Sequence, residues 1–224
     1  MNSDLDPAVS KAIARSIGHE PPFIGVEYER IQDLHIRNSR DLRGLDPCTS
    51  LEVLVLVACD PVSTDQLSGL GSLRSLTVRD SGMNSVSGLA DISLLSCYAP
   101  RNFIHDITPL MSIPKLLNLD LTGNPLSEES YRHLVPQLTE RGCRVILSDE
   151  FEWTVTRHLH SKGVPVSCYM SPQGYRFCRP GLKLTDSPEY AHPVVQKSDA
   201  ESLLSGDPRR VFQYFADEDL IPFS

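Results

Sequence analysis

Residues 116–124 read LLNLDLTGN, and the frame of this stretch recurs through the middle of the chain. The frame has apolar residues at positions one, four and six and a small polar or thiol residue at position nine, and five copies register at intervals of 20 to 22 residues. The copies are Ile31, Leu34, Ile36, Ser39; Leu51, Leu54, Leu56, Cys59; Leu73, Leu76, Val78, Ser81; Leu94, Cys97, Ala99, Asn102; and Leu116, Leu119, Leu121, Asn124.

Each copy predicts a short strand followed by a turn and a return path. Positions four and six share one face of a strand because strand side chains alternate with period two. Asn102 and Asn124 suit the turn, where a side chain can satisfy backbone groups that the strand ladder leaves unpaired. A single amphipathic helix would explain one copy, but five copies in one frame favour stacked units with a shared core. Apolar residues about every three positions then predict a 3₁₀-like or extended return: Met83, Val86, Leu89, Ile92 and Ile104, Ile107, Leu110, Ile113.

This pattern resembles the leucine-rich-repeat family, in particular its 22-residue bacterial and phosphatase-regulator-like subclass. The resemblance covers about residues 31–147, within a predicted solenoid domain of residues 31–148, and is strongest over LLNLDLTGNPLSEESYRHLVPQLTERGCRVIL (116–147), which is similar to a closing repeat. It implies an α/β fold, a right-handed solenoid in which each repeat has a parallel strand and a short helical or 3₁₀ return. It also implies that a partner protein binds the concave face of the repeats.

The closing repeat carries the signals of a helix. Ser127 can cap it, and Gly142 follows its end. Pro136 lies inside the helical stretch and should bend or interrupt it, because proline removes a backbone donor. The expected apolar stripe is Tyr131, Leu134, Val135 and Leu138.

The two ends fall outside the repeat frame. Residues 1–30 predict an N-terminal helical cap, with Asp6 before the helix and Pro7 at its first position; a helix that docks a partner is the alternative. Residues 149–224 predict a small α+β module. Its expected elements are a helix after Asp149 and Glu152, a hairpin over 164–178, a helix from Ser198 and Glu201, a helix from Asp207 and Pro208, and an acidic close over 217–224 that is solvated or a short docking segment.

Charge and composition exclude several classes of partner. The formal charge of -8 and pI of about 5.3 would repel nucleic acid and an anionic membrane. The start of the chain lacks the basic and apolar segments of a secretory leader, and no apolar run is long enough to cross a bilayer. The six cysteines are scattered without a C-x-x-C pair, which is typical of reduced thiols. We therefore expect a cytoplasmic, monomeric protein.

Ligand-type residues occur near the C-terminus but lack the spacing of a metal site. In a helix, His158 and His160 would point to different sides, and across the expected hairpin Cys168 and Cys178 would lie on opposite faces. No local signature supports a Cys/His nucleophile either. We therefore expect no metal, no cofactor and no catalysis; the alternative is a small enzyme or metal-dependent domain at 149–224 that the repeats target to a substrate. The candidate ligand residues are His158, His160, Cys168, Cys178 and His192.

The concave face is the predicted partner-binding site. Three successive outward valines are unusual on a solvated face, and an exposed apolar patch beside arginine and tyrosine is typical of an interface. The alternative is that the N-terminal helix or the C-terminal module covers these valines. The concave face comprises Asp33, His35, Arg37, Val53, Val55, Val57, Ser75, Thr77, Arg79, Ser96, Tyr98, Arg101, Asn118, Asp120 and Thr122.

Overall fold

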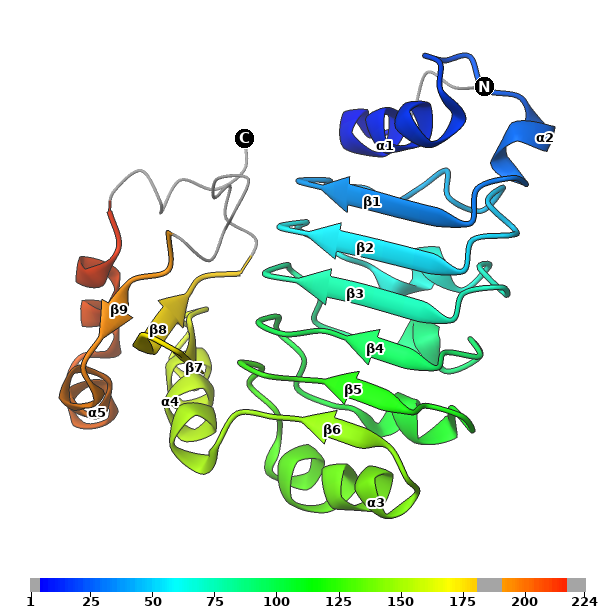
Figure 1. The fold of residues 1–224 in the computed structure, drawn as a ribbon. Helices are drawn as coiled ribbons and strands as arrows, with labels where there is room; N and C mark the ends of the chain where they lie inside the picture. The colour runs from blue at the N-terminus through cyan, green and yellow to red at the C-terminus, as the bar shows by residue number, and fades with distance from the viewer. Residues whose placement is uncertain (1–4, 181–190, 217–224) are drawn as a thin grey trace.

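A computed structural model describes residues 5–180 and 191–216 of the chain. Its main feature is a parallel sheet of six strands stacked in chain order, β1 to β6, as Figure 1 shows. The chain therefore has an α/β repeat fold, as expected. The strands are β1 (Asp33–Arg37), β2 (Val53–Val57), β3 (Ser75–Arg79), β4 (Ser96–Tyr98), β5 (Asn118–Asp120) and β6 (Arg144–Ile146).

The strand register follows the sequence frame. Leu34 pairs with Leu54 and Leu54 with Leu76, so position four of each copy lies beside position four of the next. The same alignment continues through Cys97 and Leu119. The sixth strand, β6, pairs with β5 and was not among the five copies. Identical phase between neighbours is what brings all the inward side chains into one layer.

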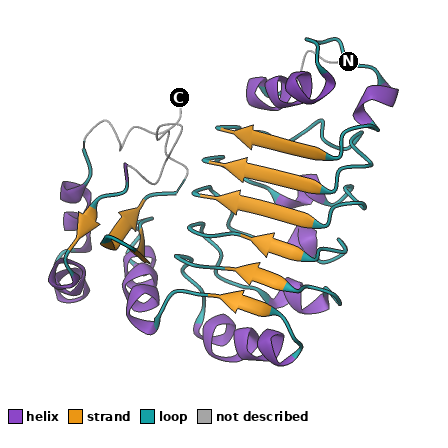
Figure 2. Cartoon of the chain, viewed as in Figure 1, coloured by secondary structure: helices purple, strands orange, loops and turns teal. Residues whose placement is uncertain are grey.

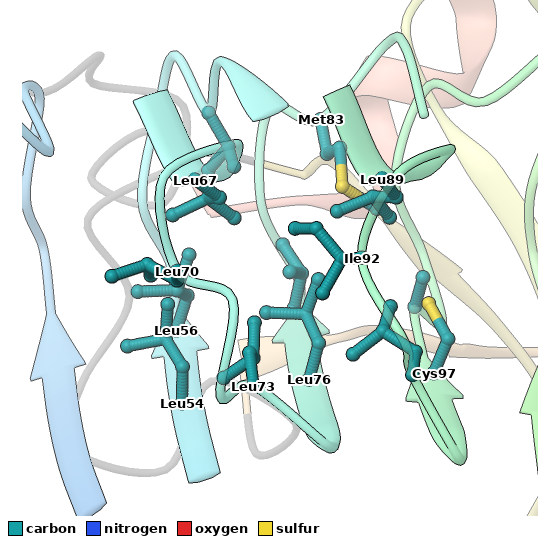
Figure 3. Packing of buried hydrophobic residues seen from close by; sticks show 14 of the residues in the cluster. Leu54, Leu56, Leu67, Leu70, Leu73, Leu76, Met83, Leu89, Ile92 and Cys97 are labelled. Carbon is teal, nitrogen blue, oxygen red and sulfur yellow. The ribbon is translucent and has the colours of Figure 1, made fainter. Parts of the chain in front are cut away.

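The core is a continuous apolar column behind the sheet. Figure 3 shows Leu54, Leu56 and Leu76 from the strands packed against side chains of the return segments. These side chains are fully buried, because the apolar side of each repeat packs against that of its neighbour. The labelled members from the returns are Leu67, Leu70, Leu73, Met83, Leu89 and Ile92.

The ninth position of each copy satisfies buried backbone groups after the strand. The side-chain amide of Asn102 donates to the carbonyl of Val78 at 2.7 Å, and its Oδ1 accepts from the N–H of Met83 at 3.3 Å. Asn124 repeats the arrangement one copy later, donating to Ala99 at 2.7 Å. The two asparagines thus tie neighbouring repeats together, as the sequence frame predicts.

The return segments of three successive copies contain 3₁₀ helices, which confirms the expectation from their three-residue apolar period. The tight turns place one apolar side chain inward in each, for example Leu67 and Leu89. The helices are Thr64–Leu67, Ser87–Leu89 and Thr108–Ser112.

At the N-terminus, α1 (Pro7–Ile17) packs against β1 and covers that end of the core. The carboxylate of Asp6 accepts from the N–H of Ala8 at 2.8 Å, as a helix cap should. Val9 and Ile13, on the side of α1 that faces the core, are fully buried. The short α2 (Gly25–Tyr28), which follows, was not expected.

The closing helix accommodates its proline by a change of winding. Residues Ser130–Leu134 form a π-helical segment directly before α3 (Val135–Glu140), so Pro136 stands in the first turn of α3. Proline is tolerated there because the N–H groups of a first turn have no partner within the helix. Gly142, with φ of 90°, follows the helix as expected.

The C-terminal module lies beside the carboxyl ends of the six strands, as Figures 1 and 2 show. Its own core includes Val155, Phe177 and Leu203. The helix α5 begins earlier than predicted, because Gln196 rather than Ser198 precedes it and its N–H donates to Asp199. The expected acidic close at 217–224 lies outside the described residues. The described elements are α4 (Glu150–Ser161), β7 (Ser167–Ser171), β8 (Gly174–Cys178), β9 (Val194–Val195), α5 (Lys197–Ser205) and the 3₁₀ helix Pro208–Tyr214.

The hairpin and α4 match the sequence prediction closely. Met170 pairs with Tyr175 and Cys168 with Phe177 around the expected turn. The helix α4 is shared between the two cores, because Trp153 packs with the repeat core while Leu159 packs with the module core. The indole of Trp153 stacks on Tyr131 of the closing helix at 4.1 Å. The module is thus packed directly onto the last repeat.

Candidate functional site

The outward side chains of the strands form three rows across the sheet. In the middle row His35, Val55 and Thr77 are neighbours in register, followed by Tyr98 and Asp120. The row nearest the amino ends holds Asp33, Val53, Ser75, Ser96 and Asn118. The row nearest the carboxyl ends holds Arg37, Val57 and Arg79.

The valines of β2 differ in exposure along the strand. Val53 is 36% exposed and Val55 is half-buried, whereas Val57 is only 6% exposed. The cap helix α1 packs against β1 and leaves Val53 accessible. Two of the three valines therefore remain accessible on the concave face, whereas Val57 lies on the same face by strand alternation but is buried.

Backbone strain marks one position of the repeat, the residue just before the ninth-position turn residue. Asn38, Ala58, Asp80 and Arg101 occupy this position in the first four copies, with φ between 52° and 62°. Gly123 occupies it in the fifth copy. A left-handed backbone is costly for most residues and lowest in cost for glycine and asparagine. A charged residue there in two neighbouring copies calls for a function of its side chain.

The side chains of Asp80 and Arg101 join the repeats to the C-terminal module. The guanidinium of Arg101 donates to both carboxylate oxygens of Asp80, with an Nη2–Oδ2 distance of 3.2 Å. Asp80 is 2% exposed. From the module side, the ring of Tyr169 lies 4.7 Å from the Arg101 guanidinium carbon, and its hydroxyl is 2.7 Å from Nδ1 of His192. The result is a buried ion pair held between two turns of the repeats and the hairpin.

Arg101 was predicted to lie on the concave face, and its side chain does not serve there as a free cation. Strand alternation ends at Tyr98, and the left-handed backbone at Arg101 directs the guanidinium to Asp80. The side chain is 12% exposed. Arg101 therefore belongs mainly to the junction with the module.

Two hollows flank the valine strand. One, of about 230 Å³, lies between α1 and β1 and is lined by Lys11, Arg15, His35 and Arg37. The other, of about 350 Å³, lies between the repeats and the hairpin. Its lining residues are Arg79, Arg101, Tyr169, Ser171, Pro172, Gln173 and Arg176.

The structure brings Cys178 and His192 together with Asp80, a grouping that the sequence spacing argued against. Their ligand-type atoms lie within 4.8 Å of one another, and Sγ of Cys178 is 3.7 Å from Oδ1 of Asp80. These donors suit zinc in kind. However, Arg101 already neutralises the Asp80 carboxylate, and burial raises the pKa of the Cys178 thiol well above its usual range. Since zinc binds a thiolate, we interpret the group as a polar junction.

The other ligand-type residues lie elsewhere. His160 packs against Phe103 at 5.5 Å between ring centres, and Cys168 is buried in the module core. His158 lines a separate hollow beside Trp153. The six cysteines are unpaired and buried, and burial raises the pKa of Cys59 to about 11 and of Cys97 to about 12. Such thiols are poor nucleophiles at neutral pH because they are protonated.

Comparison with known proteins adds little to this geometry. No protein-family model and no curated protein matches the chain. Among solved structures, internalin C2 of Listeria monocytogenes str. 4b F2365 is 18% identical, with a TM-score of 0.27 over 64% of this chain and 93% of that one. An internalin of the same strain, inlF, is 14% identical, with a TM-score of 0.35 over 67% of this chain and 59% of that one. The assignment of an α/β repeat fold therefore rests on the parallel register of the six strands and on the hydrogen bonds of Asn102 and Asn124 between copies.

Among the helices of residues 5–180 and 191–216, none combines the length and apolar character needed to cross a bilayer.

Proposed function

We propose that this chain is a non-catalytic protein-binding module, a leucine-rich-repeat solenoid of the 22-residue subclass that binds a partner protein through its concave face. The observation that carries the proposal is the accessibility of Val53 and Val55 on an otherwise polar sheet face. Apolar side chains that a chain leaves uncovered on a flat sheet gain free energy when a partner excludes water from them.

The absence of catalysis is part of the same proposal. Among the described residues, the one grouping of ligand-type side chains is Asp80, Cys178 and His192, and all three are buried at the junction. A substrate has no access to a fully buried thiol. The rival proposal, a small enzyme or metal-dependent domain at 149–224, requires this junction to open.

The setting and the partner class follow from composition. Six unpaired cysteines suit a reducing compartment, so we propose a cytoplasmic location. The negative net charge supports a protein partner over nucleic acid or a membrane surface. We propose that the chain acts as a monomer.

The test is the variant Val55→Asp, which places a charge where a partner excludes water. We expect partner binding to weaken by more than about 2 kcal/mol while thermal stability stays close to that of the unchanged chain. The readout is quantitative mass spectrometry of proteins captured on the immobilised chain, with a thermal melt of each variant. Val26→Asp is the matched control, because Val26 is 54% exposed on α2, away from the concave face.

Each other outcome has a distinct meaning. A collapsed melt for Val55→Asp would show that the chain itself covers this valine, and then the binding proposal fails. Unchanged capture together with a normal melt would remove the concave face from the hypothesis.

A further inference from the structure

We propose that the concave face recognises an uncharged, extended segment of the partner protein. Peptide groups of this segment hydrogen-bond to hydroxyls in the middle of the face, and two of its apolar side chains pack on the exposed apolar residues at either side. This inference rests on the proposed function and specifies the chemistry of the partner. The observations that carry it are the positions of charged, apolar and hydroxyl side chains over the six strands of Figure 1.

The middle of the concave face has no charged side chain, although 22% of the residues in the chain are charged. Charged side chains lie around it, for example Asp33 on β1, Asp120 on β5 and Arg144 on β6. Protein interfaces have the same arrangement, with charge depleted in the core and present at the rim. We call the uncharged outward residues of β2 to β5 the neutral centre: Val53, Val55, Ser75, Thr77, Ser96, Tyr98 and Asn118.

Charges of both signs border the neutral centre. On the amino side of the strands, Glu52 precedes β2 and Arg74 precedes β3. On the carboxyl side, Nε of Arg79 lies 3.5 Å from the carboxylate of Asp80. A border of mixed sign favours neither an acidic nor a basic segment. A charge brought onto the neutral centre would lose its water without gaining a counterion there, so the segment is uncharged where it lies on the centre.

Exposed apolar side chains flank the hydroxyls of β3 on both sides. Val53 and Val55 are on β2. On the other side, Leu95 and Leu117 directly precede β4 and β5 and are 37% and 53% exposed. The N–H of Leu117 donates to the carbonyl of Leu95 at 2.8 Å, so the two leucines are neighbours. The partner segment can therefore bury apolar side chains at two separate places.

The hydroxyls of the neutral centre indicate that the segment is extended. Those of Ser75, Thr77 and Tyr98 are half-buried and have no hydrogen-bond partner among residues 5–180 and 191–216, whereas Ser96 accepts from the amide of Asn118 at 3.1 Å. A partner that excludes water from these hydroxyls must supply new hydrogen bonds, and a hydroxyl can both donate and accept. An extended segment has N–H and C=O groups available for this, whereas a helix uses most of its own.

The strand spacing sets the spacing of the apolar side chains in the segment. Neighbouring strands are about 4.8 Å apart, so β2 and β5 are about 14 Å apart. In an extended segment that crosses the strands, residues four positions apart are separated by about 13 Å and point to the same side. One apolar residue then lies on Val53 and Val55, and the other lies on Leu117. The residue halfway between them points the same way and lies over the neutral centre.

The experiment uses labelled peptides with the whole chain, read by fluorescence anisotropy. The probe is a peptide of repeated Leu-Thr-Gln-Ser, and its controls are Leu-Thr-Glu-Ser, Leu-Thr-Lys-Ser and Ser-Thr-Gln-Ser repeats of equal length. We expect the probe to bind at least about ten-fold more tightly than each control. Its affinity should change by less than about two-fold when ionic strength rises from about 0.05 to about 0.5 M. No binding of the probe at millimolar concentration, equally tight binding of a control, or a larger change with salt overturns the inference.

Variants of the neutral centre test its chemistry. Thr77→Glu and Thr77→Lys should each weaken binding of the probe by at least about ten-fold, because a charge of either sign loses its water there. Thr154→Glu and Thr154→Lys are the matched controls on the exposed side of α4, and they should stay within about two-fold. Opposite effects of Thr77→Glu and Thr77→Lys would show that charge attraction governs binding and overturn the inference.

A further variant keeps the test valid if thermal melts show that the charged variants are unfolded. Thr77→Val preserves the shape of the side chain and removes its hydroxyl, so we expect it to weaken binding of the probe by at least about three-fold. Unchanged binding by Thr77→Val would show that the segment does not hydrogen-bond to this hydroxyl, and the inference then fails.

Failure of this inference is distinguishable from failure of the proposed function. If Val55→Asp abolishes capture of a cellular partner but Thr77→Glu and Thr77→Lys change that capture in opposite directions, the concave face binds protein and the uncharged chemistry is wrong. A dimer in gel filtration that Val55→Asp dissociates would make a second copy the occupant. If Phe223→Asp in the acidic close tightens binding of the probe by at least about ten-fold, the chain's own close is the occupant. Either of the last two results overturns an uncharged partner segment.

Discussion

The repeat region and the C-terminal module are stabilised by different kinds of interaction. The repeats share a long apolar core, and the side chains of Asn102 and Asn124 each bind backbone groups of the preceding copy. The module has a separate small core and meets the repeat edge through a buried ion pair and aromatic contacts at Asp80, Arg101 and Tyr169. In the repeat region, many equivalent contacts each contribute to the free energy of unfolding. At the junction with the module, a few contacts make most of the contribution.

Among the substitutions considered, Asp80→Asn should lower the free energy of unfolding the most, because it acts on the junction between the repeats and the module. It preserves the size and the left-handed preference of the residue but leaves the Arg101 charge buried without its counterion. We expect the free energy of unfolding to fall by about 3–5 kcal/mol, measured by urea denaturation. Asp33→Asn, an exposed acid on β1, is the control and should change little. A loss below about 1 kcal/mol for Asp80→Asn would mean that the ion pair does not anchor the junction.

Acid should weaken the junction through His160, which belongs to α4 and packs on Phe103 of the repeats. Burial lowers the pKa of His160 to about 4, while in the unfolded chain it is about 6.5. The unfolded state thus binds more protons between these values, so stability is retained above pH 6.5 and lost as pH falls towards 4. We expect the loss from this group to reach about 1–3 kcal/mol.

The measurement is the free energy of unfolding against pH for the unchanged chain and for His160→Leu. The variant should show a flatter dependence between about pH 6.5 and 4, because it carries no titrating imidazole there. His133→Leu removes an exposed histidine of the closing helix and should keep the original slope. Identical slopes for all three proteins would contradict the assignment.

Within the periodic half, Asn102→Ala and Asn124→Ala should each lower the free energy of unfolding by about 1–3 kcal/mol. Each change leaves buried backbone groups of two neighbouring repeats without their partner. Thermal melts check this, with Asn84→Ala as an exposed asparagine control from the same region. Melts of both ladder variants that coincide with the unchanged chain would show that the turn groups find other partners.

The smallest expected effect concerns metal. Because Arg101 neutralises Asp80 and the Cys178 thiol is held protonated, we expect well under one zinc ion per chain by elemental analysis. A chelator should then leave the melting temperature unchanged. Close to one zinc per chain, together with a drop in melting temperature on chelation, would turn the junction into a metal site and favour the rival function.

The sequence predicts the periodic half far better than the junction. The frame identifies five strands and both asparagine turns, because each copy repeats the same environment. It misses β6, whose short segment lacks a turn residue at position nine, and the two-residue strand β9. Arg101 was predicted on the concave face although period-two alternation from Ser96 and Tyr98 does not lead to it, and the chain leaves strand geometry after Tyr98. The meeting of Asp80 with Cys178, 98 positions later, depends on how the module packs and has no local signal.

The left-handed position of the repeat also bears on how such a molecule can lengthen. Asp80 and Arg101 occupy this position in two adjacent copies, and together they hold the module. A duplicated repeat inserted before β3 would move the N-terminal cap outward and leave the anchor intact. A repeat inserted between β3 and β4 would separate the two charges by one strand spacing and release the module. Evolution and protein engineering can therefore extend this molecule at its N-terminal side, while the adjacency of the third and fourth copies is fixed by the module that they carry.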